Sequence, residues 1–143
     1  MQIQKTTRKY RVPVMVESPF AGDVLLNVKY AQLCMIDSLN RCEAPALTHL
    51  LYTQVLEDDS PVQREIGMEC HSTWIEKVDI VAIYMDLGLT RGMRQAIEKA
   101  SGKRRTTFRY LFGELTPLAE ARELVEQYWH KSAYTPWFKE PEV

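Results

Sequence analysis

The chain has 143 residues, of which 45% are hydrophobic, and 18 Lys and Arg residues nearly balance 19 Asp and Glu residues. This length and composition predict one globular domain and exclude a chain that is disordered throughout. The formal net charge of -1 and the isoelectric point near 6.3 exclude a protein whose main affinity for nucleic acid comes from bulk positive charge, although a local basic patch stays possible.

The cysteines and the apolar runs exclude several other classes of protein. Cys34, Cys42 and Cys70 are odd in number and lack CxxC spacing, which disfavours a disulfide framework and a four-ligand zinc site. No pair of histidines has metal-ligand spacing, so we expect no metal site. We also expect no cofactor. No run approaches about 18 apolar residues, and the basic leader, residues 1–9, precedes no signal-like apolar run. These features predict a cytoplasmic protein, in the host cytoplasm if a phage encodes it.

The first predicted unit is a strand, a loop and a helix. Residues 10–16 (YRVPVMV) are rich in β-branched and apolar side chains, and Pro13 among them needs a sheet edge, a bulge or a strand start. A loop follows at residues 18–23. Asp23 then serves as the N-cap of a helix through residues 24–41.

The second predicted unit contains the clearest strand of the sequence. Residues 44–47 fit a short strand with an exit loop at residues 48–52. Ser60 and Pro61 then begin a helix that runs to about Lys77. Residues 79–85 (DIVAIYM) are nearly continuous in apolar side chains, as in a parallel strand that is covered on both faces, and we place this strand at the centre of the sheet.

The remaining elements complete a βαβαβαβα order. They are a loop at 86–92, a helix at 93–101, a strand at 107–112, a helix from Thr116 and Pro117 to about Trp129, and an aromatic tail at 132–143. This order predicts an α/β domain over residues 10–131, with an open, mostly parallel sheet of four to five strands between helices on both faces, as in flavodoxin-like and Rossmann-like folds.

Ligands of such folds bind beside the carboxyl ends of the strands, where the strand order reverses. The loops at 18–23, 48–52 and 86–92 therefore form the predicted site. Thr90, Arg91 and Gly92 precede a helix whose free amides suit an anion, with phosphate as the first candidate. The sequence lacks the GxGxxG, GxxxxGK[ST] and GxSxG motifs, so dinucleotide, P-loop and α/β-hydrolase interpretations are without their main support.

Three stretches of the sequence resemble a known family. They are VESPFAGD after the first strand, APALTHLLYTQVLEDD with Pro61 and REIGMEC, and KVDIVAIYMDLGLTRGM with AIEKA. Together they resemble a small phage and bacterial branch related to the nucleoside 2-deoxyribosyltransferases and the deoxynucleoside monophosphate N-glycosidases. The resemblance implies a nucleoside or nucleotide ligand and a homo-oligomer, because related enzymes complete their pockets across subunits.

The resemblance also shows where catalytic carboxylates are missing. The family's catalytic Glu falls on Ala96, counted from Thr90 and Gly92, and a methyl group cannot attack or stabilise an anomeric carbon. Glu98 is two residues away and points elsewhere on the helix, at about 200°. An Asp that some members place eight residues before Asp79 falls on His71, which fits either a general base or an ordinary helix histidine.

Several predicted ligand contacts have a structural alternative. Asp23 fits an N-cap, Phe20 fits either stacking on a base or packing at the sheet edge, and His49 and Tyr52 fit either the pocket or a strand exit. Asp86 follows the central strand, where it is able to accept ribose hydroxyls. The complete set of predicted ligand-binding residues is Ser18, Pro19, Phe20, Gly22, Asp23, His49, Tyr52, Asp86, Thr90, Arg91, Gly92 and Met93.

Three functions remain open at this point. The first is a nucleoside- or nucleotide-binding protein that has lost catalysis, for example one that sequesters a nucleotide. The second is an active N-glycosidase or deoxyribosyltransferase that uses a relocated group such as Glu98, Asp86 or His71. The third is a protein-interaction module that uses the aromatic tail and the basic run from Arg91 to Arg109.

Overall fold

The sheet of the domain is fully parallel. In the computed structural model, which describes residue 3, residues 10–102 and residues 105–131, four strands lie in the order β2-β1-β3-β4. They are β1 (Val12–Glu17), β2 (Glu43–Ala46), β3 (Ile80–Tyr84) and β4 (Arg105–Arg109). The predicted α/β architecture is therefore confirmed, and β3 is an inner strand as expected. The basic leader (apart from residue 3) and the aromatic tail lie outside the described residues.

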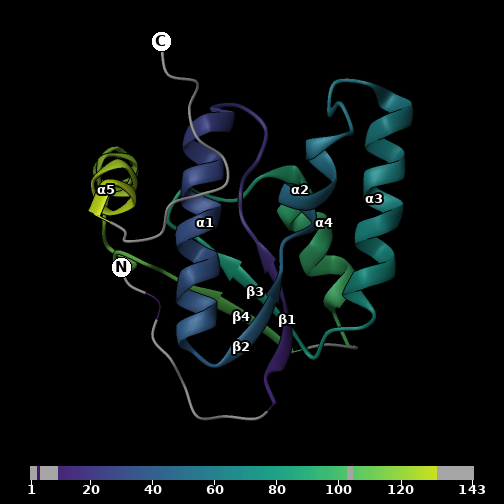
Figure 1. Ribbon diagram of the computed structural model, residues 1–143, viewed down its shortest axis with the longest axis horizontal. Coiled ribbons are helices and arrows are strands. Elements are labelled where there is room, and N and C mark those ends of the chain that lie inside the picture. The colour runs from purple at the N-terminus through teal and green to yellow at the C-terminus, as the bar shows by residue number, and fades with distance from the viewer. Residues whose placement is uncertain (1–2, 4–9, 103–104, 132–143) are drawn as a thin grey trace.

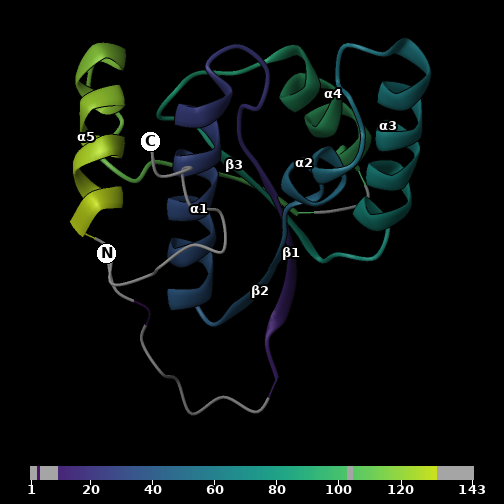
Figure 2. The ribbon, with the colours of Figure 1, turned by 45° about the horizontal axis from the view of Figure 1, so that its top comes forward.

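Helices cover both faces of this sheet (Figure 1). One face carries α1 (Val24–Asn40) and α5 (Leu118–Lys131), which pack against each other. The other face carries α3 (Pro61–Ile75) and α4 (Arg91–Ala100), with the short α2 (Thr48–Leu51) and the 3-10 turn Tyr52–Gln54 beside α3. Turning the molecule keeps α1 and α5 apart from the group of α2, α3 and α4, so the domain has three layers (Figure 2).

A hydrophobic core lies on each face of the sheet, and successive side chains of a strand point alternately into one core and the other. Val14 and Val16 of β1 pack under α1 and α5, whereas Met15 between them packs under α3 and α4. Tyr84 of β3 belongs to the first core and Ile83 to the second. Because side chains alternate along a strand, the last residue of β1, Glu17, faces the α3 and α4 layer.

The predicted helix starts are confirmed by their caps. The Asp23 carboxylate accepts a hydrogen bond from the Leu26 amide at 3.3 Å. Ser60 accepts one from the Gln63 amide at 3.5 Å, directly before Pro61. Both residues occupy the N-cap, where a side-chain oxygen replaces a missing helical acceptor. Pro13 is the second residue of β1, so its lack of an amide proton falls at the strand start, as one predicted alternative requires.

Three predicted segments differ in the structure. The helix predicted at residues 93–101 begins two residues earlier, as α4 (Arg91–Ala100), because Thr90 caps it. The exit loop expected at residues 48–52 is instead the helix α2 followed by a 3-10 turn, with Leu50 and Leu51 donating their amides to the Leu47 carbonyl at 3.1 Å. The last strand lies at Arg105–Arg109 rather than at 107–112, because the amides of Leu111 and Phe112 leave the sheet and bind the Asp86 carboxylate.

Asp86 is a buried structural carboxylate. It accepts hydrogen bonds from the Tyr30 hydroxyl at 2.6 Å, the Leu111 amide at 3.0 Å and the Phe112 amide at 2.9 Å. The Asp86 amide in turn donates to the Tyr30 oxygen at 3.0 Å. Burial, assisted by the nearby Cys34 and Asp86, raises the pKa of Tyr30 well above its usual value. One carboxylate thus joins α1, the end of β3 and the chain after β4.

A buried ion pair connects the two outer strands of the sheet. The Arg109 guanidinium binds the Glu43 carboxylate with two hydrogen bonds of 2.7 and 2.6 Å, and it also donates to the Tyr84 hydroxyl at 3.2 Å. Tyr84 donates to Asp37 of α1 at 2.7 Å. Burial alone would lower the pKa of Arg109, but the hydrogen bonds to Glu43 and Tyr84 raise it overall. Arg109 is therefore part of the core rather than of a basic surface.

We expect Asp86→Asn to lower the free energy of unfolding by about 2 to 4 kcal/mol, because the amide nitrogen would face hydrogen-bond donors that the carboxylate now satisfies. Urea denaturation followed by circular dichroism measures the change. Asp79→Asn is the matched control, since Asp79 is exposed just before β3. Equal stability of the two variants would contradict the role given to Asp86.

Candidate functional site

A cleft of about 270 Å³ opens at the carboxyl edge of the sheet, on the face of α3 and α4. Its floor is the end of β1, and its walls come from α2, α3 and the first turns of α4. The chain passes from β1 to β2 on one side and then crosses back to β3 on the other, so β1 and β3 flank the switch point of the strand order. Open α/β sheets bind their ligands at such a point.

The loop after β1 is held in place by backbone acceptors. The Asn27 side chain donates to the carbonyls of Phe20 and Ala21 at 2.9 and 3.1 Å. Gly22 has φ of 100°, which a residue with a side chain rarely adopts, so the tight turn before α1 requires glycine. These contacts hold Phe20 and Ala21 at the cleft, whereas Gly22 and Asp23 lie outside its lining.

A Ser–His pair joins the floor of the cleft to the wall formed by α2. Ser18 Oγ and His49 Nε2 lie 2.7 Å apart and share a hydrogen bond, which ties the end of β1 to α2. Burial lowers the pKa of His49, and the nearby Glu17 only partly opposes this effect. The neutral imidazole is therefore favoured in the folded protein.

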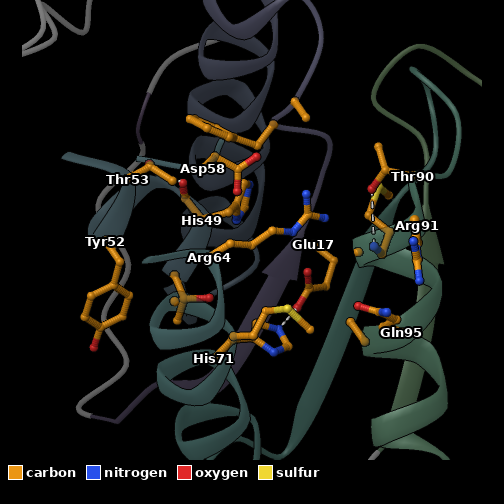
Figure 3. A pocket seen from close by; sticks show the side chains of 18 of the residues that line it. Glu17, His49, Tyr52, Thr53, Asp58, Arg64, His71, Thr90, Arg91 and Gln95 are labelled. Atoms are coloured by element: carbon orange, nitrogen blue, oxygen red, sulfur yellow. Dashed lines mark hydrogen bonds and ion pairs between the residues drawn. The ribbon is translucent and has the colours of Figure 1, made fainter. Parts of the chain in front are cut away.

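A second pair, Glu17 and His71, lies at the centre of the cleft. Glu17 Oε1 contacts His71 Nε2, and their side chains are only 8% and 17% exposed. Figure 3 shows the two side chains pointing toward one another, from β1 and α3, with Arg64 of α3 reaching into the same space. The cleft thus contains a nearly buried carboxylate that has an imidazole as its hydrogen-bond partner.

The amino end of α4 forms the opposite wall. Thr90 caps this helix by accepting a hydrogen bond from the Met93 amide at 3.2 Å. Arg91, Gln95 and Lys99 follow along the side of α4 that lines the cleft (Figure 3 labels the first two). Helix amides at this end carry partial positive charge, so Arg91 and the start of α4 together favour an anionic group.

Many of the residues predicted from the sequence line this cleft. They are Ser18, Phe20, His49, Tyr52, Thr90, Arg91, Gly92 and Met93, and the candidate general base His71 lines it too. The structure thereby brings together residues of the three segments that the sequence analysis selected, although residues 48–52 are helical and Arg91 and Gly92 belong to α4. This placement makes them neighbours of one cavity, and their contact with a ligand stays a prediction.

Four predicted ligand contacts lie outside the cleft lining. Asp86 is occupied by Tyr30 and two amides, so its carboxylate has a structural role in place of the expected ribose contact. Asp23 caps α1 and pairs with Arg122 at 3.2 Å. Pro19 is buried and Gly22 forms the turn. The candidate acid Glu98 is also outside the lining, on an exposed part of α4.

The sequence analysis missed several charged residues of the cleft lining, which are Glu17, Arg64, Glu57, Asp58 and Lys99. Arg64 precedes His71 by seven residues, with Gly67 and Met68 between them, which is the spacing of one helix face. From this spacing, Arg64 could have been predicted to lie on the same side of the helix as His71. Glu17 is an acid at the end of a buried strand, and the alternation of β1 was the only hint of the face that it occupies.

Comparison with known proteins places the chain in one family. The model of the family described as a domain of unknown function, DUF7768, matches residues 12–110, which is more than two thirds of the chain. The chain belongs to this family. The match covers the whole sheet and the cleft. A search of curated proteins found no significant match.

The described residues contain neither a metal-binding cluster nor a membrane-spanning helix. Among residues 3, 10–102 and 105–131, no group of three or more His, Cys, Asp or Glu side chains is arranged to hold a metal ion. Within the same part of the chain, no helix is long and apolar enough to cross a membrane.

We expect acidification to destabilise the protein partly through His49. The pKa of His49 is lower in the folded protein than in the unfolded chain, so the unfolded chain is protonated first as the pH falls. The free energy of unfolding therefore decreases below about pH 6.5, by at most about 1.4 kcal/mol per pH unit for one proton. Urea denaturation at pH 7.5 and 5.0 should show a smaller loss for His49→Gln than for the wild type. His130→Gln, at a histidine that is 70% exposed, is the control and should behave as the wild type.

Proposed function

We propose that the cleft binds a nucleoside monophosphate or a closely related nucleotide. The observation that carries this proposal is the pairing, within one cleft, of an anion-favouring wall and an aromatic wall. The start of α4 and Arg91 suit a phosphate, and Phe20 and Tyr52 offer rings for a base. The cavity volume of about 270 Å³ lies near the lower end for ligand pockets, which favours a small ligand.

The resemblance to nucleoside 2-deoxyribosyltransferases supports the same ligand class and argues against that family's usual chemistry. Ala96 lines the cleft and is 1% exposed. The resemblance implies that the family's catalytic carboxylate is replaced here by a buried methyl group. Binding without transfer, for example to sequester a nucleotide, is the function that follows. Phage origin and homo-oligomer formation stay predictions of the resemblance.

We expect Arg91→Ala to weaken binding of deoxynucleoside monophosphates about tenfold and to leave binding of the matching nucleosides unchanged, because only the former carry a phosphate. Isothermal titration calorimetry measures both. Arg94→Ala is the matched control, since Arg94 is exposed on the same helix but does not line the cleft. No binding of any nucleotide at millimolar concentration by the wild type would end the proposal.

A second candidate function is hydrolysis of an N-glycosidic bond, and the Glu17–His71 pair favours it. Glu98 lies outside the cleft lining and Asp86 is saturated with hydrogen bonds, so Glu17 is the best-placed relocated acid. Its carboxylate would stabilise positive charge at the anomeric carbon as the bond to the base breaks. The base would leave with the electron pair of the broken bond, water would form the new C–O bond and give one proton to His71, and His71 would pass this proton to the departed base.

We expect any release of free base from a deoxynucleoside monophosphate to fall about a hundredfold or more in Glu17→Gln. Chromatography of the products measures the release. Glu57→Gln is the matched control, because Glu57 also lines the cleft but is exposed and is not part of the Glu17–His71 pair. Absence of release by the wild type, with nucleotide binding intact, would reject hydrolysis and leave the binding function standing.

A further inference from the structure

A second hollow, of about 720 Å³, lies between α1, β2 and α2 and is mainly apolar. Val24, Val28 and Met35 line it from one face of α1, at helical spacings of four and seven residues. Leu51 and Trp74 form the other wall and are 53% and 45% exposed. A contiguous apolar surface of this kind marks an interaction site. We refer to it as the apolar groove.

We propose that the C-terminal segment of the same chain, residues 132–143, docks in the apolar groove. This segment contains three large aromatic side chains within five residues, Tyr134, Trp137 and Phe138. Aromatic side chains bury more apolar surface than other residues and suit a groove that is lined by aliphatic side chains and Trp74. The inference is independent of the proposed function of the cleft.

The end of α5 brings the chain to the edge of the groove. Trp129, two residues before the end of α5, donates its indole proton to the Gln32 side chain at 2.8 Å, and Gln32 itself lines the groove. Lys29 of α1 also holds α5 in place. Its Nζ lies 3.0 Å from the Glu126 carboxylate and 4.8 Å from the centroid of the Trp129 ring. The described end of α5 therefore lies beside the apolar groove.

The segment is long enough to follow the groove. From Met35 back to Val24, the α1 wall spans eleven residues of helix, or about 17 Å. Twelve extended residues reach up to about 40 Å. Pro136 and Pro141 restrict the backbone and favour extended conformations at the residues before them, which suits a strand-like path along α1.

Tethering favours the same chain over a second copy. A segment joined to the domain by a short connection is present at an effective concentration of the order of millimolar, far above micromolar protein. The groove also shares Phe20, Thr48 and Thr53 with the cleft. A docked segment would therefore support one wall of the cleft from behind.

Photo-crosslinking of the full chain tests the proposal. With benzoylphenylalanine in place of Trp137, we expect irradiation to give adducts with α1 or α2 residues of the groove, at the mass of one chain. The label in place of Leu115, which is 94% exposed and outside the groove, should give none with these residues. In the Trp137-labelled chain, Leu51→Arg should lower the adduct yield about tenfold by placing a charge in the apolar groove.

Ile66→Arg is the matched control for this substitution, because Ile66 is also an exposed apolar side chain but lies outside the groove. Its adduct yield should equal that of the unsubstituted labelled chain. Adducts with other surfaces, or a yield that Leu51→Arg leaves unchanged, would overturn the proposal. Adducts at the mass of two chains would also overturn it, in favour of a second copy as the occupant.

Discussion

The carboxylate of Asp86 is the contact on which the arrangement of the domain depends most. It lies just after β3 and binds the Tyr30 hydroxyl of α1 and the amides of Leu111 and Phe112. An unpaired carboxylate in this position would carry a large desolvation cost, so α1, the end of β3 and the chain after β4 have to meet for the group to be buried. The same contacts end β4 and fix where the chain leaves β3 for α4. The cleft wall at Thr90 is positioned by this anchor.

Polar side chains are divided between the two faces of the sheet. On the α1 and α5 face, Asp86 and the Arg109–Glu43 pair are closed networks whose members satisfy one another. On the α3 and α4 face, Glu17 and His71 meet in a cleft that is open to a ligand. The alternation of side chains along β1 and β3 produces this division, because it sends successive residues to opposite layers. The closed polar networks and the polar groups of the cleft are thereby separated by the thickness of one sheet.

The cleft also explains why the resemblance to glycosyl-transferring enzymes does not by itself give an activity. The carboxylate that such chemistry needs would fall on Ala96, yet another carboxylate, Glu17, enters the same cavity from a neighbouring strand. Binding requires only the walls of the cavity, whereas bond cleavage requires a charged group at the reacting carbon. The two candidate functions therefore differ in what they require of Glu17 and agree on the ligand.

The sequence by itself determined the order of elements, the parallel sheet and the caps at Asp23 and Ser60, because hydrophobic period and capping are properties of neighbouring residues. It also selected the three segments that surround the cleft, since a parallel sheet gathers the carboxyl ends of its strands at one edge. Only the tertiary structure decided that α2 is helical, that Asp86 is structural and that Glu17 meets His71. These outcomes depend on contacts between residues far apart in the chain, 56 positions for Tyr30 and Asp86 and 54 for Glu17 and His71. Local patterns carry no information about which buried partner a carboxylate will meet.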